Sequence, residues 1–237
     1  MGVLIVVFLL TAGTGLQAES LPEWMIPLRE AFYEQKLQVD EVMPLYLAAK
    51  AAAQEEYSGT AQDLAVSRCE YYMGRILQFY EQNKEARVHY LEGMRLAEKA
   101  VNAAPSAEAW LSRAENLSQA CSLSTVGYVV AHGLDVEKFA RNALAINSRN
   151  AGAQYVVAAR WVYAPSPWGN LKKGIEMMKA ILENSDMGKD DYFNVYYSIG
   201  YAYMQQKKYD EAWSWLLRAQ EIYPTNKYLT ELLEKKK

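Results

Sequence analysis

Residues 196–224 read YYSIGYAYMQQKKYDEAWSWLLRAQEIYP, and they are the most informative part of the sequence about the fold. Small residues stand at Gly200, Ala212 and Ala219, where they let two helix backbones approach each other closely. Larger side chains fill the space around that contact: Tyr196, Ile199, Tyr203 and Leu216. Pro224 then ends the second helix, because proline cannot continue it. The stretch therefore predicts a hairpin of two packed helices.

The spacing of these eight positions resembles that of the tetratricopeptide repeat, a helix-turn-helix unit with a period of about 34 residues. All eight positions match the repeat in size class. The resemblance implies that the hairpin is one unit of a stacked array, because a single repeat cannot bury its apolar face alone.

Weaker copies of the pattern lie upstream. One copy ends its second helix at residues 143–148, and another ends at Ala100 with Pro105 five residues later. A further hairpin runs from residues 157–161 to residues 174–181. Four hairpins then cover residues 65–226. The sequence predicts an all-α chain that forms an α-solenoid of about four tetratricopeptide-like hairpins.

Two connections in this array are longer than the repeat requires. Residues 118–135 add about ten residues and residues 164–170 add a few. Long loops of a solenoid tend to gather on one face and often carry binding. We expect Trp168, at the tip of the second loop, to turn back and cover the seam between hairpins.

Capping helices are expected at both ends of the array, because a terminal repeat must cover an otherwise exposed apolar face. Residues 19–60 predict a pair of helices at 24–36 and 39–57, and residues 227–237 predict a final helix. With the repeats at 61–226, residues 19–237 are predicted to form a single helical domain.

The first 18 residues read as a signal peptide. Residues 3–10 are an unbroken apolar run, followed by a polar and small stretch and a cleavage point after Ala18. The run is too short to span a bilayer, so no transmembrane span is expected in the mature chain. A buried N-terminal helix is the alternative. The signal peptide predicts a periplasmic or secreted protein.

Charge and cysteine content narrow the function further. The net charge is -3, which gives no electrostatic reason to expect nucleic acid as a partner. Cys69 and Cys121 are the two cysteines. They either form one disulfide or remain buried free thiols, since neither lies in a CxxC pair that would indicate redox chemistry.

Catalytic motifs are absent from the sequence. His89 and His132 are the two histidines, and there is no HExxH and no Gly-rich phosphate loop. We therefore expect no enzyme activity, no cofactor and no metal. The remaining enzyme hypothesis uses His132 in the 118–135 loop, and it requires a carboxylate and a nucleophile within hydrogen-bond reach.

Binding is then expected on the surface that the stack creates. In tetratricopeptide arrays the first helix of each hairpin lines a concave groove. The same offsets applied here select a surface that is rich in Tyr, with Arg at one end and Glu in the middle, and Tyr and Arg suit recognition. Arg68 and Arg75 lie two turns apart, so they either hold a carboxylate jointly or pair with Glu70 or Glu81. The predicted partner-binding residues are Arg68, Tyr71, Arg75, Tyr155, Tyr163, Asn194, Tyr197 and Tyr201.

The signal peptide, the irregular hairpins and the two enlarged loops are also similar to those of the periplasmic tetratricopeptide proteins associated with TRAP transporters. That resemblance implies binding to a solute-binding transporter subunit, and it names a small amphipathic ligand as an alternative. A scaffold that docks a partner polypeptide predicts an open groove. The ligand binder predicts an enclosed apolar pocket near residues 118–135.

Overall fold

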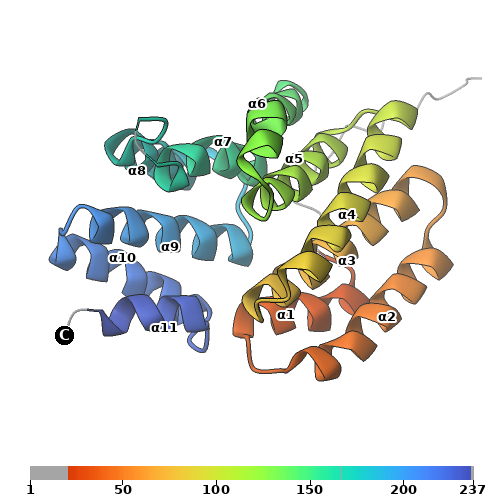
Figure 1. The fold of residues 1–237 in the computed structure, drawn as a ribbon, viewed down its shortest axis with the longest axis horizontal. Helices are drawn as coiled ribbons and strands as arrows, with labels where there is room; N and C mark the ends of the chain where they lie inside the picture. The colour runs from red at the N-terminus through yellow and green to blue at the C-terminus, as the bar shows by residue number, and fades with distance from the viewer. Residues whose placement is uncertain (1–20, 166, 236–237) are drawn as a thin grey trace, which may run out of the picture.

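The computed structural model describes residues 21–165 and 167–235 of the chain, and within them the fold is all-α (Figure 1). The predicted signal peptide lies outside the described residues. Four helical hairpins follow one another, each packed on the next. Their helices are α3 (Gly59–Phe79) with α4 (Asn83–Ala103), α5 (Ala107–Ser122) with α6 (Val126–Ile146), α7 (Ala151–Tyr163) with α8 (Leu171–Asn184), and α9 (Lys189–Gln205) with α10 (Tyr209–Ile222).

Helices outside the hairpins lie at both ends of the array. The chain enters through a short 3-10 helix, Glu23–Met25, which leads into α1 (Ile26–Glu34) and α2 (Val39–Glu56). After the last hairpin, α11 (Lys227–Glu234) packs on α10. The predicted solenoid of four tetratricopeptide-like hairpins is confirmed.

Close packing inside the last hairpin depends on the small residues that the sequence singled out. A Cβ atom added to Gly200 would lie 2.5 Å from Cδ2 of Leu216, closer than real contacts allow. Ala212 and Ala219 are completely buried at the same helix contact. The turn between the helices is made at Lys207, whose φ of 59° is left-handed and reverses the chain without a glycine.

The predicted loop at residues 118–135 is wrong. Helix α5 continues to Ser122 and α6 begins at Val126, so the connection is only three residues long. The insertion lengthens both helices of the second hairpin. The loop was predicted because these residues exceed the repeat spacing. Gly127 and Gly133 both lie within α6, since a glycine inside a helix costs only about 1 kcal/mol and does not end it.

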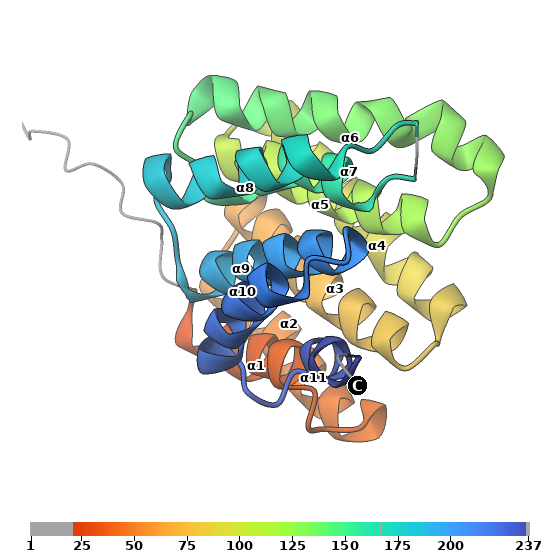
Figure 2. The ribbon, with the colours of Figure 1, turned by 90° about the vertical axis from the view of Figure 1, so that its left-hand side faces the viewer.

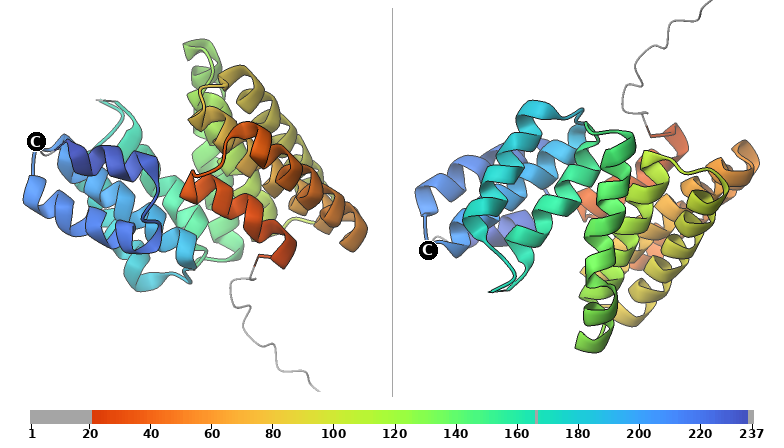
Figure 3. Two further views of the ribbon diagram at one scale, coloured as in Figure 1. Left: turned by 90° about the horizontal axis from the view of Figure 1, so that it is seen from below. Right: turned by 90° about the horizontal axis from the view of Figure 1, so that it is seen from above.

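The two ends of the array meet, which the sequence did not predict. Helix α1 packs on α3 in the first hairpin, and its last turn also contacts the last hairpin (Figures 2 and 3). The ring of Tyr33 stacks on that of Tyr223, with centroids 4.6 Å apart. The Nδ2 of Asn226 donates to the carbonyl oxygen of Tyr33 at 2.8 Å, and the Oγ1 of Thr225 donates to the carbonyl of Glu34 at 2.8 Å.

Both cysteines are free and buried, so the free-thiol alternative holds in this structure. Burial raises the pKa of the Cys69 thiol to about 12, which keeps that group protonated at neutral pH. Within the described residues, no helix combines the length and the apolar character needed to cross a membrane.

Candidate functional site

The first helices of the hairpins form one continuous face. Helix α3 contacts α5, α5 contacts α7, and α7 contacts α9, so side chains from four hairpins lie along the same surface. The eight predicted partner-binding residues all come from these helices. Arg68, Tyr71 and Arg75 lie on α3, Tyr155 and Tyr163 on α7, and Asn194, Tyr197 and Tyr201 on α9.

A tyrosine cluster lies where α7 meets α9. The hydroxyls of Tyr155 and Tyr163 lie 3.0 Å and 2.8 Å from Oγ of Ser198, a fully buried residue. The ring of Tyr163 lies 5.2 Å from that of Tyr201, measured between centroids. Tyr163 is nevertheless 44% exposed, so this cluster offers an aromatic surface whose hydroxyls are already positioned.

The two arginines of α3 do not act together. Arg68 pairs with Glu115 of α5, with Nη1 and Oε2 2.7 Å apart. Burial raises the pKa of the Glu115 carboxyl, and Arg68 opposes that shift. Arg75 instead donates to the hydroxyl of Tyr71 at 3.1 Å and lies over the ring of Phe32, 4.7 Å from its centroid. The predicted pairing with Glu70 or Glu81 is wrong, because Arg68 pairs with Glu115 and Arg75 contacts Tyr71 and Phe32.

Part of the predicted groove is occupied by the chain itself. The Nδ2 of Asn194 donates to the hydroxyl of Tyr33 in α1 at 3.1 Å. The ring of Tyr197 stacks on that of Phe193 at 6.1 Å, and Tyr197 and Tyr201 are half-buried against the core that α1 and α11 share with the hairpins. Local sequence carries no signal for the Tyr33 contact, because it joins residues 161 positions apart.

Glu70, which sequence reasoning placed beside the arginines, is the centre of a different cluster. Its carboxylate is 2% exposed and accepts from the hydroxyl of Tyr46 at 2.8 Å and from Nζ of Lys50 at 2.7 Å. Nδ1 of His89 lies 2.6 Å from its second oxygen. These side chains come from α2, α3 and α4, so the cluster joins the N-terminal helices to the first hairpin.

His132 lies in helix α6, outside any loop. Its Nδ1 is 3.9 Å from Oδ2 of Asp135 on the next turn, which is beyond hydrogen-bond distance. Its ring packs on Tyr128, with centroids 4.4 Å apart. In residues 21–165 and 167–235, no cluster of three or more His, Cys, Asp or Glu side chains could hold a metal ion.

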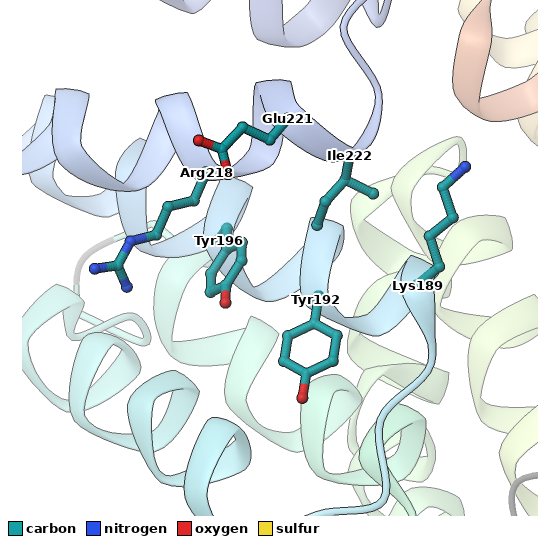
Figure 4. Close-up of a pocket in the computed structure, with 6 residues that line it drawn as sticks. All are labelled: Lys189, Tyr192, Tyr196, Arg218, Glu221 and Ile222. Atoms are coloured by element: carbon teal, nitrogen blue, oxygen red, sulfur yellow. The ribbon is translucent and has the colours of Figure 1, made fainter.

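A surface recess lies between α9 and α10 (Figure 4). Its volume is about 550 Å³, and Tyr192 and Tyr196 enter it from α9. Helical spacing puts these rings on the side of α9 opposite to Tyr197 and Tyr201. The recess is therefore separate from the face described above, and it is distant in sequence from residues 118–135. Its lining residues are Lys189, Tyr192, Tyr196, Arg218, Glu221 and Ile222.

Comparison with known proteins identifies the last hairpin. Residues 193–226 match the family model of the tetratricopeptide repeat. The matched residues include the stretch at 196–224 from which the fold was predicted. No curated protein matches the chain. The comparisons lend no support to the resemblance to TRAP-associated proteins. The chain is thus an all-α solenoid that is similar, over its last hairpin, to the tetratricopeptide repeat.

Proposed function

We propose that the protein is a non-catalytic scaffold of the cell envelope that binds a partner polypeptide on the face formed by α3, α5, α7 and α9. Tetratricopeptide repeats typically serve protein–protein interaction, and the match at residues 193–226 supports that general role. The observation that carries the finer proposal is the tyrosine cluster of Tyr155, Tyr163 and Tyr201. Large aromatic side chains with ordered hydroxyls bring contact area at low entropic cost.

The proposed partner is a single segment. Helix α1 takes up the surface beside Arg75 and Asn194, so the proposed contact runs along Tyr155, Tyr163 and Tyr201. One extended or helical segment can follow such a line of side chains. A solute-binding subunit of a TRAP-type transporter is one partner class that the sequence resemblance suggests. The small-ligand alternative required a loop at residues 118–135 that closes a pocket, and these residues form no such loop.

Capture from an envelope extract with matched variants tests the binding face. Tyr163→Ala should reduce recovery of the bound partner at least tenfold, because it removes the exposed ring of the cluster. Tyr209→Ala is the control, since Tyr209 is also 44% exposed but lies on α10, outside the face. Equal recovery by wild type and Tyr163→Ala would refute the assignment.

The envelope location is tested separately. Mass spectrometry of the mature protein from its native cell should give Glu19 as the first residue, as expected for cleavage after Ala18. A protein that retains residues 1–18 and fractionates with the cytoplasm would contradict the proposed location and leave the binding face to be judged on its own test.

A further inference from the structure

The recess between α9 and α10 has the size of a small-molecule site. Its volume of about 550 Å³ lies within the range of roughly 300–1,000 Å³ that such sites occupy. The rings of Tyr192 and Tyr196 give it an aromatic surface, with centroids 5.9 Å apart, and Ile222 of α10 extends that surface. Tyr192 is 38% exposed, so a ligand can reach its ring.

Two cations flank this aromatic surface. Figure 4 shows Arg218 and Lys189 on opposite sides of the two tyrosine rings. The Cζ of Arg218 lies 4.7 Å from the ring centroid of Trp215 and 5.9 Å from that of Tyr196. A guanidinium over a ring is held by its face, and its N–H donors, which lie in its plane, remain available. Both cationic side chains are exposed.

Arg218 lacks the counterion that other arginines beside rings have. Arg68, Arg113 and Arg160 each lie over an aromatic ring and also pair with a glutamate. Over the part of the chain that the structure describes, no carboxylate forms an ion pair with Arg218 or Lys189. The recess therefore offers an aromatic surface beside a guanidinium that is free to bind an anion.

The charges of the lining select how many negative charges a ligand carries. Arg218, Lys189 and the carboxylate of Glu221 together give the recess one net positive charge. That charge repels a cation, and Glu221 opposes a ligand with two or more negative charges. A single negative charge is the best match.

We propose that the recess binds a small aromatic monocarboxylate. The ring of the ligand packs on Tyr192 and Tyr196, and its carboxylate accepts from Arg218, whose planar fork matches a carboxylate. Lys189 adds attraction at longer range, because it also interacts with the carboxylate of Asp190.

The open side of the recess limits the affinity. A ligand there keeps part of its surface in water, so the expected Kd is on the order of 0.1–1 mM. The recess lies on the side of α9 opposite to Tyr197 and Tyr201, so a ligand in it leaves the proposed partner-binding face free. The test of one site therefore does not decide the other.

Titration with naphthoate, followed by the backbone amide chemical shifts, tests the proposal. Saturable shifts should concentrate in residues 189–196 and 215–222, with a Kd in the stated range. Naphthamide has the same rings without the charge, so it should bind at least fivefold more weakly. Equal affinity for the two compounds, or saturable shifts mainly outside these segments, overturns the proposal.

Matched variants separate the role of the guanidinium from that of the rings. Arg218→Gln should weaken naphthoate at least fivefold and leave naphthamide unchanged. Tyr192→Ala should weaken both compounds by a similar factor, because it removes the ring contact that they share. Lys172→Gln is the control for loss of a positive charge, since Lys172 is exposed on α8, outside the recess, and this variant should bind like wild type.

Circular dichroism checks that the three variants are folded, as expected for substitutions of exposed side chains. Unchanged binding of naphthoate by Arg218→Gln overturns the proposal. An equal loss in Arg218→Gln and Lys172→Gln would show that naphthoate responds only to the overall charge of the protein, and it would also overturn the proposal.

Discussion

Single residues at helix contacts control whether this chain can stack. Gly200 permits α9 to lie against α10. This role could be predicted from the sequence, because two helices can approach closely only where one of them has a small residue. Gly127 has no such contact, because a Cβ added there would meet only Oγ1 of Thr125, at 4.0 Å. The two glycines therefore have opposite expected responses to the same substitution.

Gly200→Ala is expected to destabilise the protein by about 1–3 kcal/mol, because the new methyl group must displace Leu216. Gly127→Ala is expected to stabilise it by about 0.5–1 kcal/mol, through the higher helix propensity of alanine. Urea unfolding at neutral pH measures both. Similar effects of the two substitutions would show that the α9–α10 contact is not limited by Gly200.

Glu70 is a buried carboxylate whose contribution to stability depends on its hydrogen bonds. Burial raises the pKa of its carboxyl, but the bonds from His89, Lys50 and Tyr46 outweigh burial and hold the pKa below its ordinary value. A carboxyl with a lowered folded-state pKa contributes stability above its unfolded pKa of about 4.3, and that contribution is lost as the pH falls through the folded-state value.

Glu70→Gln is therefore expected to cost about 2–4 kcal/mol at pH 7, since it leaves Lys50 without its buried partner. The gap between wild type and variant should narrow as the pH falls below about 4.3. Denaturant unfolding at pH 7 and in steps down to pH 3 follows this gap. A difference that stays constant over that range would mean that the ionised carboxylate is not what stabilises the cluster.

At the level of elements, the N-cap residues of two helices differ in how many hydrogen bonds their side chains make. Asn226 and Asn170 both accept from the backbone N–H three residues later, at the starts of α11 and α8. Asn226 also donates to the carbonyl of Tyr33 and is 3% exposed. Asn170→Ala should cost about 1 kcal/mol, the usual loss of a cap.

Asn226→Ala should cost about 1–2 kcal/mol more than Asn170→Ala, because it also leaves the Tyr33 carbonyl without its donor. Thermal and chemical unfolding of both variants give the comparison. Equal losses would indicate that the contact between α1 and the C-terminal end adds nothing to stability.

Elements also show where sequence reasoning succeeds and where it fails. The helices around residues 24–36 and 39–57 and all four hairpins were predictable, because size pattern and apolar period are local. The continuation of α5 and α6 through residues 118–135 was missed, because residues in excess of the repeat spacing were assigned to a loop, whereas packing around Leu117 and Phe139 keeps them helical. Trp168 was expected to cover a seam, yet it is 65% exposed.

For the candidate face, the sequence supplied the helices and the residue types. It could not supply the pairing of Arg68 with Glu115, which depends on how two hairpins are offset. The role of the eight residues in binding a partner stays a prediction that the Tyr163 experiment addresses.

The whole molecule departs from an open solenoid, in which each repeat contacts only its neighbours and distant repeats are independent. Here α1 bonds to residues about 190 positions away. Removing residues 224–237 should therefore lower hydrogen-exchange protection of α1 by at least tenfold, while α5 at the centre of the array changes much less. Unchanged protection of α1 would mean that its packing on α3 alone fixes it.

That contact also dictates an order of events during synthesis. Helix α1 is among the first parts of the fold to leave the ribosome, and Thr225, Asn226 and Lys227 are among the last. Hairpins can form one after another as they emerge. The bonds of α1 can therefore be completed only after residues 225–227 have been synthesised, so the N-terminal region of the fold stays unfinished until then.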